Sequence, residues 1–91
     1  MSFLKRLFGG GAASAPAYDA VEHDGFTIQP DPIAEGGQYR LAATISKEVD
    51  GEMRTHRLIR ADVFQDAGQA AQFAVTKARQ VIAEQGERLF R

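Results

Sequence analysis

The chain has 91 residues, no cysteine and a formal net charge of −1 at pH 7. This length accommodates one small domain, and the lack of cysteine excludes disulfide bonds and thiolate metal ligands. A charge so close to zero excludes a bulk electrostatic attraction to nucleic acid. Because no disulfide is possible, a reducing cytoplasm is the compartment we expect.

The N-terminal residues 1–18 are expected to lie apart from a folded domain that spans residues 19–91. A Gly/Ala/Ser/Pro tether at residues 9–17 follows a short amphipathic tip. Eight residues cannot hold a helix alone in water, so we expect the tip to be disordered unless it touches something. Three interpretations of the tip remain open: a frayed terminus, a segment that docks on the core of its own domain, or a segment that contacts a membrane or a partner. The apolar side chains that would make such a contact are Phe3, Leu4, Leu7 and Phe8.

A first strand region is predicted at residues 20–29. Asp24-Gly25 interrupts it, either as a bulge or as a turn. Pro30-Asp31-Pro32 ends it, because proline lacks the N–H that a strand ladder needs. Residues 35–37 then form a loop that leads into the next strand.

Residues 38–60 predict an antiparallel β-hairpin around Asp50-Gly51, because apolar and polar residues alternate and this dipeptide suits a tight turn. A two-residue turn pairs Ile45 with His56 and Ala43 with Leu58. A three-residue turn with a glycine bulge instead pairs Leu41 with Ile59 and Ile45 with Thr55. The Asp-Gly dipeptide favours the two-residue turn.

A helix is predicted from Asp66, as its N-cap, to about Gln85, and Gly86 supplies the left-handed residue that ends it. Phe73 lies off the apolar stripe, as a rim contact or as part of an interface. The stripe contains four alanines, which allow the helix to approach a sheet closely. Its members are Ala70, Ala71, Ala74, Val75, Ala78, Val81 and Ile82.

These elements predict an α+β fold, in which a three- to four-stranded antiparallel sheet packs on one C-terminal helix behind a flexible N-terminal tail. One helix covers one face of the sheet and leaves the other face open. In the register with the two-residue turn, the open face shows Arg40, Thr44 and Arg57.

No catalytic or metal motif stands out. His23 and His56 share no ligand spacing with each other or with a carboxylate. The serines lack a base in a fixed relation, and no Gly-x-Ser-x-Gly elbow is present. We therefore expect no enzyme activity, no catalytic residue, no metal and no cofactor.

The candidate binding residues are arginines of the hairpin: Arg40, Arg54, Arg57 and Arg60. Alternation along the second strand sends Arg54 and Arg60 to one face and Arg57 to the other, so these three cannot form one flat patch. No helix-turn-helix is readable. A double-stranded-RNA-binding-like module remains an alternative, although its last helix would need a basic start and this one begins with Asp66 and Gln69.

Several blocks in the same order give the chain a family likeness, and they span nearly its whole length. On these blocks it resembles the small proteobacterial family named after the transcriptional activator HlyU. The resemblance implies a bacterial transcriptional role and carries over no catalytic residues. The blocks are residues 3–9 (FLKRLFG), 25–28 (GFTI), 30–33 (PDPI), 35–40 (EGGQYR), 56–62 (HRLIRAD), 78–82 (ARQVI) and 84–86 (EQG).

Together these observations predict a non-enzymatic regulatory or interaction domain, with transcriptional activation implied by the resemblance alone. The alternatives are a membrane-peripheral adaptor held by the N-terminal tip and the double-stranded-RNA-binding-like module. We expect a protein partner; DNA contact lacks a recognisable motif, and the tip could give a weak membrane contact. The sequence leaves a monomer and a homodimer equally open.

Overall fold

The structure is a computed structural model that describes residues 18–91. The predictions for the tip and tether at residues 1–17 lie outside these described residues. The elements in chain order are β1 (Val21–His23), β2 (Phe26–Pro30), β3 (Ile33–Glu35), β4 (Gln38–Val49), β5 (Glu52–Phe64), α2 (Ala67–Gln85) and the 3₁₀ helix η1 (Gly86–Phe90).

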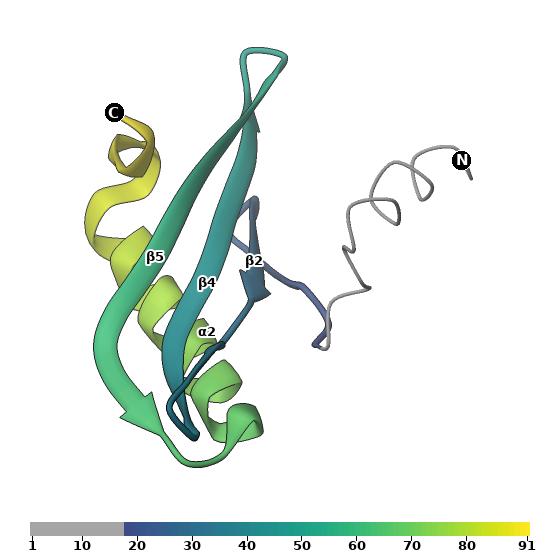
Figure 1. Cartoon of the computed structure of the whole chain (residues 1–91). Coiled ribbons are helices and arrows are strands. Elements are labelled where there is room, and N and C mark those ends of the chain that lie inside the picture. Colours follow the sequence, from purple (N-terminus) through teal and green to yellow (C-terminus); the bar gives the residue numbers. More distant parts are fainter. Residues whose placement is uncertain (1–17) are drawn as a thin grey trace.

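The described strands form one five-stranded antiparallel sheet around β4. β2 and β3 pair with different parts of one side of β4, β1 pairs with β2, and β5 pairs with the other side of β4. β4 and β5 are the two long strands of Figure 1. The predicted α+β architecture is confirmed, and the sheet has more strands than the three or four expected because two short strands, β1 and β3, add to it.

Two Asp-Gly dipeptides make the tight turns of this sheet. Asp24 and Gly25 have φ angles of 50° and 82°, and Asp50 and Gly51 have 54° and 81°. Positive φ at both central residues is the signature of the turn that matches the twist of a two-residue hairpin. Of the two possibilities left open for Asp24-Gly25, the turn is therefore correct, and it joins β1 to β2.

The register of the long hairpin is the one that the two-residue turn predicts. Ile45 lies opposite His56, and Ala43 lies opposite Leu58. The regular pairing ends at an irregularity: Ala42 lies opposite Ile59, but Arg40 lies opposite Val63. Residues 60–62 of β5 therefore face a single residue of β4, and β5 bends at this point.

α2 begins and ends where the sequence predicts. The Asp66 side chain accepts a hydrogen bond from the backbone N–H of Gln69 at 2.8 Å, which satisfies one of the free donors of the first turn. Gly86 follows the helix with φ 56°, in the left-handed region. Its buried side chains are Ala70, Ala71, Ala74, Ala78, Val81 and Ile82.

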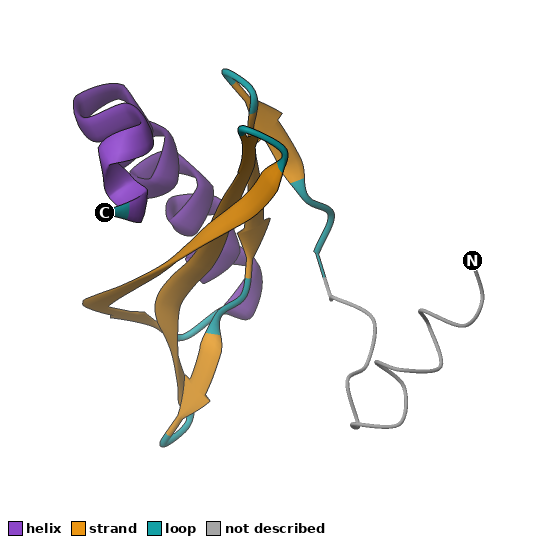
Figure 2. Cartoon of the chain, turned by 90° about the horizontal axis from the view of Figure 1, so that it is seen from above, coloured by secondary structure: helices purple, strands orange, loops and turns teal. Residues whose placement is uncertain are grey.

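α2 lies along one face of the sheet, as Figure 2 shows from above, and the core side chains lie between the two. Ile28 of β2 and Ile45 of β4 are fully buried, and Ala74 and Ala78 of α2 have no exposed surface. Small helix side chains bring the helix axis close to the sheet, so the larger strand side chains fill the space between them. The opposite face of the sheet has no helix upon it among the described residues.

The chain end packs back on the sheet through η1. Leu89 is buried, and the Phe90 ring stacks on Phe26 with a centroid distance of 6.0 Å. Lys47 of β4 also contacts η1 and the Phe26 ring: its Nζ lies 2.9 Å from Glu87 Oε2 and 4.7 Å from the centre of the Phe26 ring. Leu89 thus belongs to the core cluster, and Phe90 packs against it.

Candidate functional site

The open face of the sheet is the side that α2 leaves uncovered, and we define it by the strand alternation. Ile45 and Leu58 face the helix, so the residues next to them in each strand point the other way. The open face consists of Thr27 and Gln29 of β2, Arg40, Ala42, Thr44, Ser46 and Glu48 of β4, and Met53, Thr55, Arg57, Ile59 and Val63 of β5.

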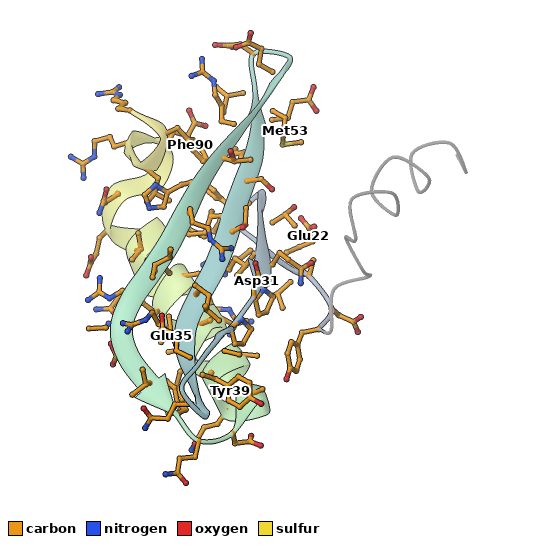
Figure 3. The ribbon with its side chains drawn as sticks, in the orientation of Figure 1. Glu22, Asp31, Glu35, Tyr39, Met53 and Phe90 are labelled. Carbon is orange, nitrogen blue, oxygen red and sulfur yellow. The ribbon has the colours of Figure 1, made fainter. Side chains whose placement is uncertain are left out.

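Arg57 lies on the open face in the edge strand β5, opposite Thr44 of the central strand, and two partners hold its side chain. Its Nη1 donates to Asp31 Oδ2 at 2.8 Å and to Thr44 Oγ1 at 3.0 Å. Asp31 follows β2, so the Arg57 guanidinium crosses over β4 on the open face and reaches the strand on the other flank of β4. The arrangement brings together Thr44 and Arg57, as the sequence predicted, and adds the carboxylate of Asp31, which is labelled in Figure 3.

Arg40 forms the second charged contact of this face. Its Nε and Nη2 donate to the two carboxylate oxygens of Glu35 at 2.9 and 2.7 Å, which is the two-pronged geometry of a strong ion pair. Its Nη1 also donates to the backbone oxygen of Arg60 at 3.2 Å, beside the irregularity of β5. The hydrogen bond from Arg40 is the main cause that lowers the pKa of Glu35, and the same bond raises the pKa of Arg40.

The two arginines therefore carry their own counter-charges. DNA binding is driven by free cationic side chains that displace the counterions condensed on the phosphates, whereas Arg40 and Arg57 each already contact a carboxylate. Arg54 and Arg60 do not add to this face. Arg54 lies near Glu52, at 3.5 Å, and lines a shallow groove with Phe90 on the helix side of the sheet.

Exposed apolar side chains also gather on the open face. Met53, Ile59 and Val63 are 65%, 51% and 38% exposed, and all three come from β5. The other large exposed apolar residue of the described chain is Phe73 of α2. It stacks on Phe64 with a centroid distance of 5.1 Å, which is the rim contact that the sequence offered as one of two possibilities, and its exposed surface leaves the interface possibility as a prediction.

Sequence reasoning missed the two carboxylates that partner the arginines. Asp31 lies between two prolines and was assigned to the segment that ends a strand. Glu35 precedes two glycines and was assigned to a loop. Glu35 is in fact the last residue of β3 and lies opposite Gln38, two residues before Arg40. Pairing of residues 33–35 with β4 would have placed it beside Arg40, but three residues are too few to show a strand pattern.

A cluster of side chains suited to a metal ion is not found in residues 18–91. No group of three or more histidine, aspartate or glutamate side chains is placed to hold a metal ion there. No helix in this part of the chain has the length and apolar character needed to cross a membrane. The predicted contacts at Phe3, Leu4, Leu7 and Phe8 lie outside it.

Comparison with known proteins adds the family. The model of the HlyU family, described as transcriptional activator HlyU, matches residues 2–90. The chain belongs to the HlyU family. The likeness that the sequence blocks indicated is thereby confirmed, and transcriptional regulation is the role that the HlyU description gives. No curated protein and no solved structure matches the chain.

Proposed function

We propose that this chain is a non-enzymatic transcriptional regulator that binds another protein through the open face of its sheet. The observation that carries the proposal is the composition of that face. It combines exposed Met53 and Ile59 with arginines that are already paired to Asp31 and Glu35. Apolar surface beside neutralised charge is suited to a protein partner, whose surface is itself mixed.

Direct reading of DNA has less support from the described residues. α2 is the only α-helix among them, and it is held against the sheet by its alanine stripe. Its solvent side carries Gln72, Thr76, Arg79 and Gln80, and the half-buried Lys77 beside them donates from Nζ to Gln80 Oε1, so this stretch has two cations. A recognition helix needs cations and amides directed at phosphates and base edges, and it is normally presented by a second helix.

The test compares transcripts in the host that carries the gene. A strain without the gene is complemented with the wild-type chain, with Ile59→Lys on the open face, or with Ala83→Lys on the exposed side of α2 as a matched control. We expect the wild type and Ala83→Lys to restore the same set of transcripts, and Ile59→Lys to fail while keeping its fold by circular dichroism.

Titration with duplex DNA separates regulation through a protein partner from regulation by direct DNA binding. We expect no binding at about 50 mM salt, where a protein that contacts phosphates binds most strongly. Binding that falls steeply with salt and is lost in Arg57→Ala would overturn the protein-contact proposal. Unchanged transcripts in every strain would overturn the regulatory role itself.

A further inference from the structure

The outer edge of β5 is a long unpaired strand. β5 has 13 residues, of which only Leu58 is buried, and among the described residues it pairs with β4 alone. Its other edge therefore presents backbone N–H and C=O groups to solvent. An edge of this kind is a template for another strand unless the protein blocks it.

The turn determines which backbone groups point outward. A two-residue hairpin closes with a hydrogen-bonded pair, here Val49 and Glu52, and hydrogen-bonded and non-hydrogen-bonded pairs then alternate. The outward-pointing N–H and C=O groups of the regular part of β5 are therefore those of Met53, Thr55, Arg57 and Ile59.

Two observations on the other side of β4 agree with this assignment. Alternation makes Ala43 turn its backbone groups toward β5, so it should not bond to its opposite residue in β2, and that residue is Pro30, which has no N–H. Ala42 should turn toward β2, and its carbonyl oxygen accepts a hydrogen bond from the N–H of Asp31 at 2.9 Å.

The irregularity of β5 limits the length of edge that can pair. Regular pairing with β4 runs from Glu52 to Ile59 and is lost over residues 60–62. A strand added at this edge would therefore take its backbone hydrogen bonds from residues 53–59, with Glu52 and Arg60 at the two ends of the paired segment. A bulge also discourages long, unspecific strand addition, so any partner must match a short segment.

We propose that a second copy of this chain pairs antiparallel with this segment, about a two-fold axis that passes between the two His56 residues. This register places Met53 opposite Ile59 of the second copy and Thr55 opposite Arg57 of the second copy. On the helix side it places Glu52 opposite Arg60 of the second copy. Each of these three pairs occurs twice because the contact is symmetric, and the His56 pair on the axis occurs once.

Charge and side-chain type favour this register over its neighbours. An axis at Arg57 would set Arg54 opposite Arg60 of the second copy, which is a repulsive pair. An axis at Thr55 would set Met53 opposite the Arg57 guanidinium of the second copy. An axis at Leu58 would run the pairing through residues 60–62, where β5 is irregular.

The His56 register also accounts for exposed apolar surface. Met53 and Ile59 are more than half exposed in the single chain. The pairing sets Met53 of one copy beside Ile59 of the other copy. The two sheets become one continuous sheet, and the two open faces lie side by side on the same side of it. The inference rests on the unpaired backbone edge of β5 and does not require the regulatory role proposed above, although it uses Met53 and Ile59 of the same open face; Thr55→Pro and the exchange at Glu52 and Arg60 test it without changing these two residues.

The first experiment measures self-association of the full chain by sedimentation velocity over a range of concentrations. We expect a reversible dimer. Thr55→Pro removes an outward N–H that makes no bond within the sheet, so the fold should persist while the dimer weakens roughly ten- to a hundredfold. A Thr55→Val variant, which keeps the N–H, is the matched control and should dimerise as the wild type does.

A charge exchange tests the register. Glu52→Arg alone and Arg60→Glu alone should each weaken the dimer roughly tenfold, and the double variant should restore it. Arg79→Glu, on the solvent side of α2, is the control for a change of charge elsewhere and should have no effect. A dimer that is insensitive to Thr55→Pro and to both single exchanges would overturn the proposal.

Single cysteines give a direct reading of the axis, because the natural chain has none. Under mild oxidation, His56→Cys should form a covalent dimer faster than Arg54→Cys or Leu58→Cys, since only residue 56 faces itself. Fastest cross-linking at another position would overturn the His56 axis. A chain that remains monomeric at every concentration would overturn the pairing altogether.

Discussion

Arg57 of β5 and Asp31, the residue after β2, form an ion pair across the face of β4, with 2.8 Å between Nη1 and Oδ2. The pair joins the two strands that flank the central strand, and Thr44 of β4 accepts a second hydrogen bond from the same nitrogen. The residue that the sequence marked as a contact for a partner therefore also links three parts of the sheet.

The first prediction is that this ion pair contributes little to stability. Both side chains are well exposed, at 40% and 58%, so water and salt screen their attraction. We expect Arg57→Ala and Asp31→Ala each to lower the free energy of unfolding by about 1 kcal/mol or less. Urea unfolding of the two single variants and the double variant measures the coupling, and a value well above 1 kcal/mol would contradict this expectation.

The second prediction concerns DNA. The variant Asp31→Asn/Glu35→Gln leaves the guanidinium groups of Arg40 and Arg57 without their carboxylates. We expect non-specific affinity for duplex DNA to rise at low salt and to fall again as salt is added. Fluorescence anisotropy with any short duplex measures the change. Asp19→Asn/Glu84→Gln changes the net charge equally at exposed residues that make no contact with Arg40 or Arg57, and a rise of the same size in this control would show a bulk effect only.

The third prediction concerns pH and follows from the contact between Arg40 and Glu35. Arg40 lowers the pKa of Glu35 below its ordinary value of 4.5 in the folded chain. Between the folded and the unfolded pKa of Glu35, the unfolded chain binds more protons than the folded chain. The stabilisation of the fold by the contact between Arg40 and Glu35 is therefore complete above about pH 4.5, and it is lost as the pH falls through the folded pKa. Wild type and Glu35→Gln should therefore differ in melting temperature at pH 7 and converge at low pH.

A control variant separates this effect from general acid denaturation. Arg40→Gln removes the cause of the lowered pKa, so its melting temperature relative to Glu35→Gln should vary little with pH. If the difference in melting temperature between wild type and Glu35→Gln were the same at every pH, the assignment of the lowered pKa to this contact would be wrong.

The features that were predictable from sequence are those fixed by a few neighbouring residues. Asp50-Gly51 determines the turn of the long hairpin, and the turn determines the register that sets Ile45 opposite His56. Asp66 and Gly86 mark the ends of α2 in the same local way. Each of these signals acts within a few residues, so it can be read without knowledge of the rest of the fold.

The features that were not predictable depend on residues far apart in the sequence. The contact between Arg57 and Asp31 spans 26 positions and exists only because β2 and β5 lie on opposite sides of β4. β3 has three residues, too few for alternation to show, so the position of Glu35 beside Arg40 stayed hidden. The open face was correct in outline, but its electrostatic character depends on these two carboxylates.

The fourth prediction tests the close approach of α2 to the sheet. Ala74 has no exposed surface, and it packs in the cluster that contains Ile28 and Ile45. Replacing it with leucine adds atoms to a space that is already filled, which forces side chains from their preferred rotamers or moves the helix. We expect Ala74→Leu to lower the free energy of unfolding by about 1–3 kcal/mol.

Ala83→Leu is the matched control, because residue 83 lies on the same helix and is exposed. Alanine and leucine have similar helix propensity, so the change there should stay within about 0.5 kcal/mol. Urea denaturation of both variants gives the comparison. If Ala74→Leu were as stable as Ala83→Leu, the helix would not be held against the sheet at this alanine. Losses of similar size in both variants would instead point to the helix itself, because residue 83 makes no core contact that leucine could disturb.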